Sequence, residues 1–288
     1  MSNWVLYAAA VLIWGTTWFA INFQLGVVGP EVSLAYRFIA ASALLFAWCR
    51  LRKLPLRFDA AAHGHFVGMG TFLFGLNYLF AYSAQLYIAS ALNAIAFTAI
   101  LWFNIMNARV VLGTHISRRT LLGAVAGMIG TIVIFWPEVE SVSFSDRVLA
   151  GAMFSIVGAL CASFGNLASA LAQRRGLPVV QGNAWGMLYG GLLTAAIALA
   201  RGESFVFEPN APYVVSLVYL TLFGTVLAFG AYLTLLGRIG AERAGYAVVM
   251  VPIVALVVSA LFEDLRLTPA MGIGVALALA GNLLILRR

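Results

Sequence analysis

The chain has 288 residues, of which 63% are hydrophobic and only 9% are charged, and its formal net charge is +7. An ordinary soluble domain carries about 25% charged residues, so this composition excludes a soluble globular protein. The high hydrophobicity also excludes a disordered chain. The composition therefore predicts an all-α integral membrane protein.

Ten segments are apolar enough to cross a bilayer, which requires about 20 predominantly apolar residues. None of them alternates apolar and polar residues as the strands of a membrane barrel do. The sequence thus predicts ten transmembrane helices, with expected bounds 3–22, 31–50, 66–87, 90–112, 119–136, 148–172, 181–201, 212–236, 242–262 and 268–286.

Polar and aromatic side chains recur three and four residues apart in the first four spans, so they share helix faces. Unpaired polar groups are costly in hydrocarbon, and we expect these faces to line a central substrate cavity. Interhelical packing is the alternative for Tyr78, Tyr82 and Trp102. The candidates, in chain order, are Trp14, Trp18, Arg37, Tyr78, Tyr82, Gln85, Asn93, Phe97 and Trp102.

Arg37 lies inside the second span, where a charge is expensive. Three roles are open for it: snorkelling towards the interface, pairing with Glu31, or binding a substrate carboxylate. In the fifth span, Gly123, Gly127 and Gly130 share one face, and we expect close helix packing there.

The later spans carry comparable stripes of polar and aromatic residues. The predicted cavity residues are Ser163, Asn166, Trp185, Tyr189 and Tyr246, and the eighth span has a further stripe of Thr221, Thr225 and Tyr232. Four residues are predicted hinges that let spans 3–4 and 8–9 bend: Gly75, Gly224, Gly230 and Pro252. Proline lacks a backbone donor and kinks a helix, and glycine softens one.

The positions of Lys and Arg predict the orientation, because these residues accumulate in cytoplasmic loops. With the N-terminus inside, the outer loops hold only Arg147, Arg201 and Arg266. Both termini are therefore expected to be cytoplasmic. The inner loops hold Arg50, Arg52, Lys53, Arg57, Arg118, Arg119, Arg174, Arg175, Arg238, Arg243, Arg287 and Arg288.

The two halves of the chain show a weak internal repeat. Leu73-Phe74-Gly75 matches Leu222-Phe223-Gly224, and Gly123 and Gly130 match Gly274 and Gly281. Equivalent loops differ in basic content in the direction that opposite insertion requires. We therefore predict a 5+5 inverted repeat, with residues 1–137 as the first repeat (spans 1–5) and 148–288 as the second (spans 6–10). Inverted repeats are typical of secondary transporters.

Several short motifs resemble the EamA-type branch of the drug/metabolite transporter superfamily. They are Trp14-Gly15, Arg37-Phe38, Pro252 and the pair Gly274 and Gly281. The second half departs from the pattern with Ala162-Ser163 in place of Trp-Gly, and Leu101 stands at the position equivalent to Pro252. The resemblance covers essentially the whole chain and extends to a bacterial exporter of amino acids, including aromatic ones. It implies a transporter of the inner membrane that works by export.

All acidic residues and histidines fall in loops or at span ends. We therefore expect no proton or sodium site with a carboxylate at mid-membrane, no metal site, no cofactor and no nucleic-acid partner. The expected partners are the lipid bilayer and a small molecule such as an amino acid, and a monomer is plausible. Two alternatives stay open: a multidrug or hydrophobic-cation exporter, and a lipid-modifying membrane enzyme that uses Asp59, His63 and His65. Amino acid export is the main prediction, and catalysis is not expected.

Overall fold

The computed structural model describes residues 1–88, 90–134, 136, 146–262 and 268–286. A few predicted features lie outside these residues: the loop position Ala89, the basic residues Arg266, Arg287 and Arg288, and the repeat ends at 137 and 288.

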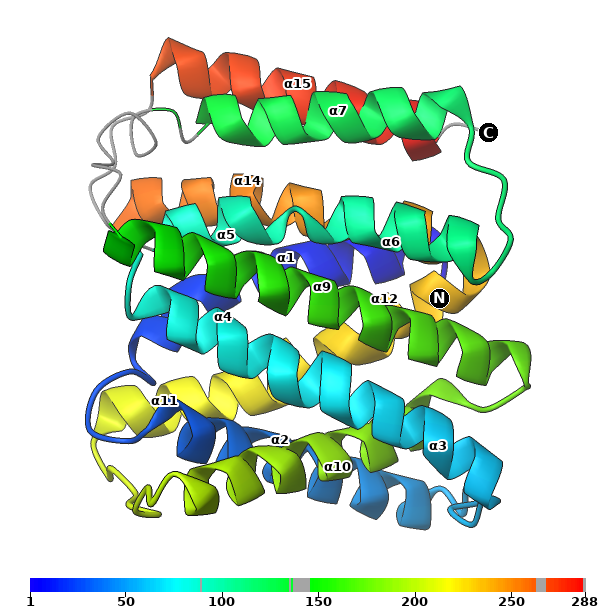
Figure 1. The fold of residues 1–288 in the computed structure, drawn as a ribbon, viewed down its shortest axis with the longest axis vertical. Helices are drawn as coiled ribbons and strands as arrows, with labels where there is room; N and C mark the ends of the chain where they lie inside the picture. The colour runs from blue at the N-terminus through cyan, green and yellow to red at the C-terminus, as the bar shows by residue number, and fades with distance from the viewer. Residues whose placement is uncertain (89, 135, 137–145, 263–267, 287–288) are drawn as a thin grey trace.

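Every regular element in the described part of the chain is a helix, and the helices lie side by side across the view of Figure 1. The first half contains α1 (Asn3–Asn22), α2 (Pro30–Leu51), α3 (Ala60–Met69), η1 (Gly70–Leu76), α4 (Asn77–Gln85), α5 (Ser90–Phe97), α6 (Ile100–Val110) and α7 (Arg118–Ile134). The second half contains α9 (Asp146–Arg174), α10 (Val179–Ala200), α11 (Ala211–Tyr219), η2 (Leu220–Leu227), α12 (Ala228–Ile239), α13 (Ala241–Ala244), α14 (Tyr246–Phe262) and α15 (Pro269–Leu286).

Seven of the described helical runs are long and apolar enough to cross a membrane: Asn3–Asn22, Pro30–Leu51, Ala60–Gln85, Asp146–Arg174, Val179–Ala200, Ala211–Ile239 and Ala241–Val258. The predicted fourth span is divided, since α5 ends at Phe97 and α6 begins at Ile100, and the predicted fifth span, α7, has only 17 residues. The chain is thus an all-helical, multi-pass membrane protein, and the count of ten spans stays a prediction. Large apolar side chains such as Leu122, Val215 and Ile273 are exposed, as lipid-facing residues would be.

Two π-helical segments interrupt long α-helices at matching positions of the repeat. η1 joins α3 to α4 and contains Leu73-Phe74-Gly75, and η2 joins α11 to α12 and contains Leu222-Phe223-Gly224. The wider turn of a π-helix changes the backbone hydrogen-bond register, and such segments are frequent at functional sites. The predicted hinges Gly75 and Gly224 therefore lie in π-helical segments, a feature that glycine content alone does not predict.

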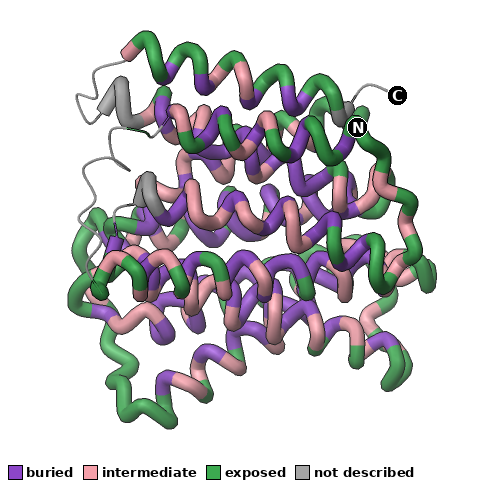
Figure 2. The backbone as a smooth tube through the Cα atoms, turned by 45° about the horizontal axis from the view of Figure 1, so that its top comes forward, coloured by how far each residue is buried: buried purple, intermediate pink, exposed green. Residues whose placement is uncertain are grey.

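Helices at equivalent positions of the two halves pack against each other. α7 pairs with α15, and α2 pairs with α10. The first helix of each half also packs against helices of the other half in a corresponding way. In the first half α1 contacts α12 and α14, and in the second half α9 contacts α4 and α6. Figure 2 shows that buried residues concentrate in the middle of this packing, with exposed residues along the outer helices. The contacts between the two halves are thus reciprocal.

Glycine makes the contact between α7 and α15 possible. A Cβ atom added at Gly130 would lie 2.6 Å from the backbone oxygen of Gly274, and one at Gly281 would lie 2.7 Å from that of Gly123. The residue numbers rise along one helix as they fall along the other, so the pair is antiparallel. The predicted small-residue face of the fifth span is therefore a backbone-to-backbone contact with the equivalent helix of the other half.

Candidate functional site

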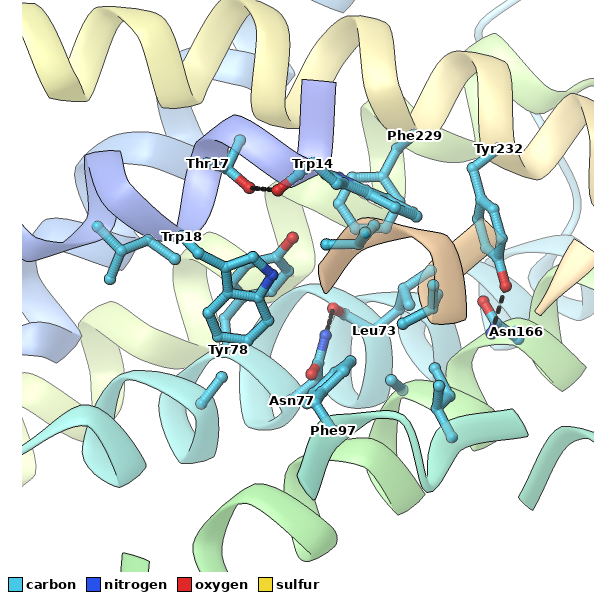
Figure 3. Close-up of a pocket in the computed structure, with 16 residues that line it drawn as sticks. Trp14, Thr17, Trp18, Leu73, Asn77, Tyr78, Phe97, Asn166, Phe229 and Tyr232 are labelled. Atoms are coloured by element: carbon cyan, nitrogen blue, oxygen red, sulfur yellow. Dashed lines mark hydrogen bonds between the residues drawn. The ribbon is translucent and has the colours of Figure 1, made fainter. Parts of the chain in front are cut away.

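A cavity of about 70 Å³ lies between helices of both halves (Figure 3). Helices of the first half, α1, η1, α4, α5 and α6, and of the second half, α9, α12 and α14, contribute to its wall. The lining residues are Trp14, Thr17, Trp18, Ile21, Leu73, Asn77, Tyr78, Ala81, Phe97, Ile100, Ala162, Asn166, Phe229, Tyr232, Val248 and Val251. Five of the predicted cavity residues meet here: Trp14, Trp18, Tyr78, Phe97 and Asn166.

Trp14 attaches the first helix to the second π-helical segment. Its indole Nε1 donates a hydrogen bond of 3.2 Å to the backbone oxygen of Gly224 in η2. Its ring lies 5.1 Å from that of Phe229 and 4.9 Å from that of Tyr232, measured between centroids. These ring contacts join α1 to α12 and form an aromatic wall on one side of the cavity. Thr17, one turn further along, donates to the backbone oxygen of Trp14 at 2.8 Å (Figure 3).

A buried amide network forms another part of the wall. Asn166 Nδ2 donates to Tyr232 Oη at 3.0 Å and to Asn104 Oδ1 at 3.3 Å, which joins α9 to α12 and α6. On the opposite helix run, Asn77 Nδ2 donates to the backbone oxygen of Leu73 at 3.0 Å (Figure 3). The Oδ1 atoms of Asn77 and Asn166 are buried and have no hydrogen-bond partner in the described part of the chain. Two buried acceptors beside the cavity are therefore unsatisfied, and a bound donor can satisfy them only once neighbouring side chains have moved.

No acidic, basic or imidazole side chain belongs to the cavity wall that the described residues form. In the same residues, no three His, Cys, Asp or Glu side chains come together as metal ligands would. Most of the wall is aliphatic or aromatic, so the expected chamber of Trp, Tyr, Asn, Gln and Thr is more apolar than predicted. The reason is that aliphatic residues such as Leu73, Ile100 and Val251 line the cavity beside the polar and aromatic ones.

Arg37 and Tyr82 lie behind the cavity wall. Arg37 is almost fully buried, at 1% exposure, so it does not snorkel to the interface. Glu31 forms its ion pair with Arg201, which makes the predicted pairing of Glu31 with Arg37 wrong. Arg37 instead donates to Thr225 Oγ1 at 2.7 Å and to Tyr82 Oη at 3.3 Å. Burial between α2, α4 and η2 keeps its side chain inside the bundle.

Four other predicted residues bond to neighbouring helices away from the cavity lining. Asn93 Nδ2 donates to the backbone oxygen of Ala81 at 2.8 Å, and Ser163 Oγ accepts from Asn107 at 2.8 Å. Gln85 Nε2 donates to Asn22 Oδ1 at 3.1 Å near the end of the span. Trp102 donates to the sulfur of Met128 in α7. For Trp102 the packing alternative is thus the one that the contacts support.

Trp185, Tyr189 and Tyr246 also lie outside the cavity lining. Trp185 Nε1 donates to the backbone oxygen of Leu56 at 3.2 Å, and the Tyr189 hydroxyl lies 2.8 Å from His63 Nδ1. Tyr246 is buried, and its backbone oxygen accepts from the Tyr7 hydroxyl at 3.2 Å. These aromatic faces therefore meet other helices or a loop rather than the cavity.

The suggested enzyme cluster consists of residues that already have structural partners. Asp59 caps α3 by accepting from the backbone N–H of Ala62 at 2.8 Å. The ring of His63 packs 4.7 Å from that of Trp185, and His65 lies 3.3 Å from Arg175. These contacts, with the bond between His63 and Tyr189, give each of the three residues a structural role at the end of α3.

Three polar or aromatic lining residues, Thr17, Asn77 and Phe229, are not among the predicted cavity residues, and Tyr232 was predicted only as part of a further stripe. Thr17 is three residues after Trp14, and Phe229 is three before Tyr232. This spacing puts Thr17 and Phe229 each on the same helix face as a predicted residue, and it could have identified them. Of the predicted hinges, Gly230 has open space around it, and Pro252 lies inside α14.

We predict that replacing Asn166 with alanine lowers the free energy of unfolding by about 2 kcal/mol, because it leaves Tyr232 Oη and Asn104 Oδ1 buried without a partner. Replacing Tyr232 with phenylalanine keeps the ring and is expected to cost about 1 kcal/mol. Unfolding in mixed micelles, followed by circular dichroism, measures both values. Asn22→Ala is the control, because it removes only one exposed hydrogen bond, from Gln85. An equal loss in all three variants would contradict the network.

Known proteins resemble this chain over almost its whole length. The model of the EamA-like transporter family matches residues 2–136 and, separately, 149–287. A crystal structure with 20% sequence identity superposes with a TM-score of 0.79 over 99% of this chain and 96% of the other, which shows a shared fold.

Three curated proteins illustrate the range of similar sequences. "Uncharacterized transporter YoaV" of Bacillus subtilis is 24% identical over 86% of this chain and 84% of its own. "Uncharacterized inner membrane transporter YedA" of Escherichia coli K12 is 26% identical over 86% and 78%. A "Probable amino-acid metabolite efflux pump" of the same organism is 23% identical over 96% and 92%.

Proposed function

The chain belongs to the EamA-like transporter family, and from this premise we propose that it exports amino acids, including neutral and aromatic ones, or similar small metabolites. The names of its relatives describe transporters rather than enzymes. The cavity shared by the two halves is the observation that carries the proposal, because secondary transporters hold their substrate at the interface between repeats.

The chemistry of the cavity wall supports a small amphipathic substrate. Trp14, Trp18 and Tyr78 present aromatic faces to an apolar side chain, and the free Oδ1 atoms of Asn77 and Asn166 accept hydrogen bonds from an ammonium group. One relative is named as a probable amino-acid metabolite efflux pump. This name agrees with a zwitterionic substrate.

The proposed architecture is a 5+5 inverted repeat of ten spans, with repeats over 1–137 and 148–288. The family model matches each half separately. The reciprocal packing of α2 with α10 and of α7 with α15 also supports it. The proposed location is the bacterial inner membrane, where one relative is named as a transporter. The excess of Lys and Arg in the corresponding loops supports a cytoplasmic location of both termini.

Alternating access is the proposed mechanism. A cavity of about 70 Å³ has to widen towards one side and then towards the other to pass an amino acid. The π-helical segments η1 and η2, with Gly75 and Gly224, are the proposed bending points, together with Gly230 and Pro252. Because the described cavity wall contains no carboxylate, the substrate gradient drives the flux without a proton or sodium site at mid-membrane.

Efflux and counterflow in liposomes that contain only the purified protein test this proposal. Labelled phenylalanine, leucine, methionine and threonine are the substrates, each measured with and without a pH gradient. We expect counterflow of at least one of them at a rate that the pH gradient does not change. Absence of all four fluxes contradicts amino acid transport. A flux that requires the gradient and is abolished by neutralising one acidic residue contradicts the passive mechanism.

The apolar character of the wall favours one second candidate, a multidrug or hydrophobic-cation exporter. Such a compound would contact a hydrophobic surface formed by Ile21, Phe97 and Phe229, and aromatic faces attract cations. The same liposomes loaded with tetraphenylphosphonium separate the two functions. Tetraphenylphosphonium counterflow without amino acid counterflow would support the second candidate over the first.

A further inference from the structure

Arg37 is a buried cation that no carboxylate neutralises in the described part of the chain. Only 1% of its surface is exposed. The ion pair found among the described residues joins Glu31 to Arg201 instead. A buried charge without a counter-charge is strongly unfavourable. An ionisable residue at such a position within a membrane helix therefore indicates a functional partner.

The groups that surround Arg37 hold the guanidinium but carry no negative charge. Nε donates to Thr225 Oγ1 at 2.7 Å, and Nη1 donates to Tyr82 Oη at 3.3 Å. The guanidinium carbon lies 4.7 Å from the centroid of the Tyr78 ring. A guanidinium has five N–H donors, so these contacts leave donors free. They fix its position and leave both charge and hydrogen-bonding capacity available.

The guanidinium lies one side chain behind the cavity wall. Tyr78, which packs against it, lines the cavity. A Cβ atom placed on Gly224 would be 2.8 Å from Thr17 Cγ2, on another lining residue, and 3.4 Å from Arg37 Nη2. Such a Cβ would clash with Thr17, so α1 and η2 pack closely here and leave no open space beside Gly224. Arg37 Nη2 thus lies behind the lining residues Thr17 and Tyr78, whose side chains have to move before a substrate group can reach it.

Resting on the function proposed above, we propose that Arg37 recognises the carboxylate of the transported substrate. The carboxylate reaches Nη2 between Thr17 and Tyr78 and supplies the missing negative charge, since guanidinium and carboxylate form strong charge-assisted hydrogen bonds. The free oxygens of Asn77 and Asn166 accept the substrate's ammonium protons. The site then has a partner for each charged group of an amino acid.

If Arg37 has this role, a substrate needs a carboxylate to be transported efficiently. A hydrophobic cation would enter a cavity with an uncompensated positive charge beside it, and Coulomb repulsion in a medium of low dielectric opposes its binding. An amino acid amide has the same side chain and ammonium group but no negative charge. Comparing an acid with its α-amide therefore isolates the contribution of Arg37.

The experiment measures counterflow of phenylalanine, leucine, methionine and threonine and of their four α-amides by the full-length protein in liposomes. In the wild type we expect each transported acid to be preferred over its amide by about tenfold or more. In Arg37→Gln we expect the KM for the acid to rise by about 30-fold or more, because a buried charge pair is lost. The amide is affected little, so the preference disappears.

Control variants separate recognition from a structural role. Arg37→Lys keeps the charge and should retain part of the preference, and Arg52→Gln, at an exposed position at the end of the same helix, should retain all of it. If Arg37→Gln slows transport of acid and amide equally, Arg37 only holds η2 in position through Thr225. That result overturns the inference. Wild-type transport of acids and amides at equal rates overturns it without any variant and leaves amino acid transport intact. Failure of the wild type to move any acid overturns the proposed function itself.

Discussion

Alanine at Gly130 is expected to lower the free energy of unfolding by about 1–3 kcal/mol, even though alanine forms helices more readily than glycine. The added Cβ would lie 2.6 Å from the backbone nitrogen of Ala278 and 2.6 Å from the backbone oxygen of Gly274. Backbone atoms cannot rotate away as the end of a side chain can. Helices α7 and α15 therefore have to separate and lose packing contacts along their whole interface.

Two further variants make this prediction specific. Gly274→Ala should give a similar loss, since its Cβ would lie 2.6 Å from the backbone oxygen of Gly130. Gly272→Ala, in the same helix α15 and with no atom within 4 Å of the new Cβ, should be neutral or slightly stabilising. The double variant of Gly130 and Gly274 should lose less than the sum, because both changes push the same helices apart. Unfolding in mixed micelles measures all four, and a loss at Gly272 equal to that at Gly130 would contradict the packing argument.

The features of this fold that the sequence predicts are those that depend on local pattern. Apolar length identifies most membrane helices, and the glycine spacing in the fifth span predicts a close helix contact, which α7 makes with α15. The break between the predicted spans 212–236 and 242–262 is also found, and it follows from backbone geometry, since Gly240 has a φ of 89°. A positive φ suits glycine and ends a helix.

The features that escaped prediction depend on which helices become neighbours. Helical periodicity shows that Trp185 and Tyr189 share a face with each other, but the neighbour of that face is His63 and the loop at Leu56. The π-helical segments are also absent from the prediction, because their turns depend on hydrogen-bond register. The shared Leu-Phe-Gly sequence marked the two positions without revealing the geometry.

The two halves share their packing but differ in chemistry at the cavity. Pro30 in α2 matches Pro178 in α10, and at the same offset Arg37 corresponds to Trp185. Arg37 donates to Thr225 in η2, whereas Trp185 Nε1 donates to the backbone oxygen of Leu56. The second half therefore has a neutral aromatic side chain where the first half has a cation. If Arg37 binds the substrate as proposed above, this difference between the halves would give an asymmetric substrate a single preferred orientation.

Replacing Trp14 with alanine is expected to have the largest effect on transport of any change in the aromatic wall. The indole contacts Phe229 and Tyr232 and donates to the backbone oxygen of Gly224 in η2. Removing it opens the cavity wall and should lower the free energy of unfolding by about 3–5 kcal/mol. Counterflow per folded molecule should also fall below detection, since both the aromatic surface for the substrate and the attachment of α1 to η2 are lost.

Trp14→Phe separates the two contributions. Phenylalanine keeps an aromatic face but cannot donate to Gly224, so we expect a loss of about 1 kcal/mol in stability and a reduced but measurable rate of counterflow. Trp4→Ala is the matched control, because Trp4 belongs to the same helix and is 65% exposed; it should transport as the wild type does. If Trp14→Ala remains folded and transports normally, the substrate does not pass this wall. Normal transport by Trp14→Phe would mean instead that the bond to Gly224 has no part in moving η2, and that the bending of the eighth span is independent of α1.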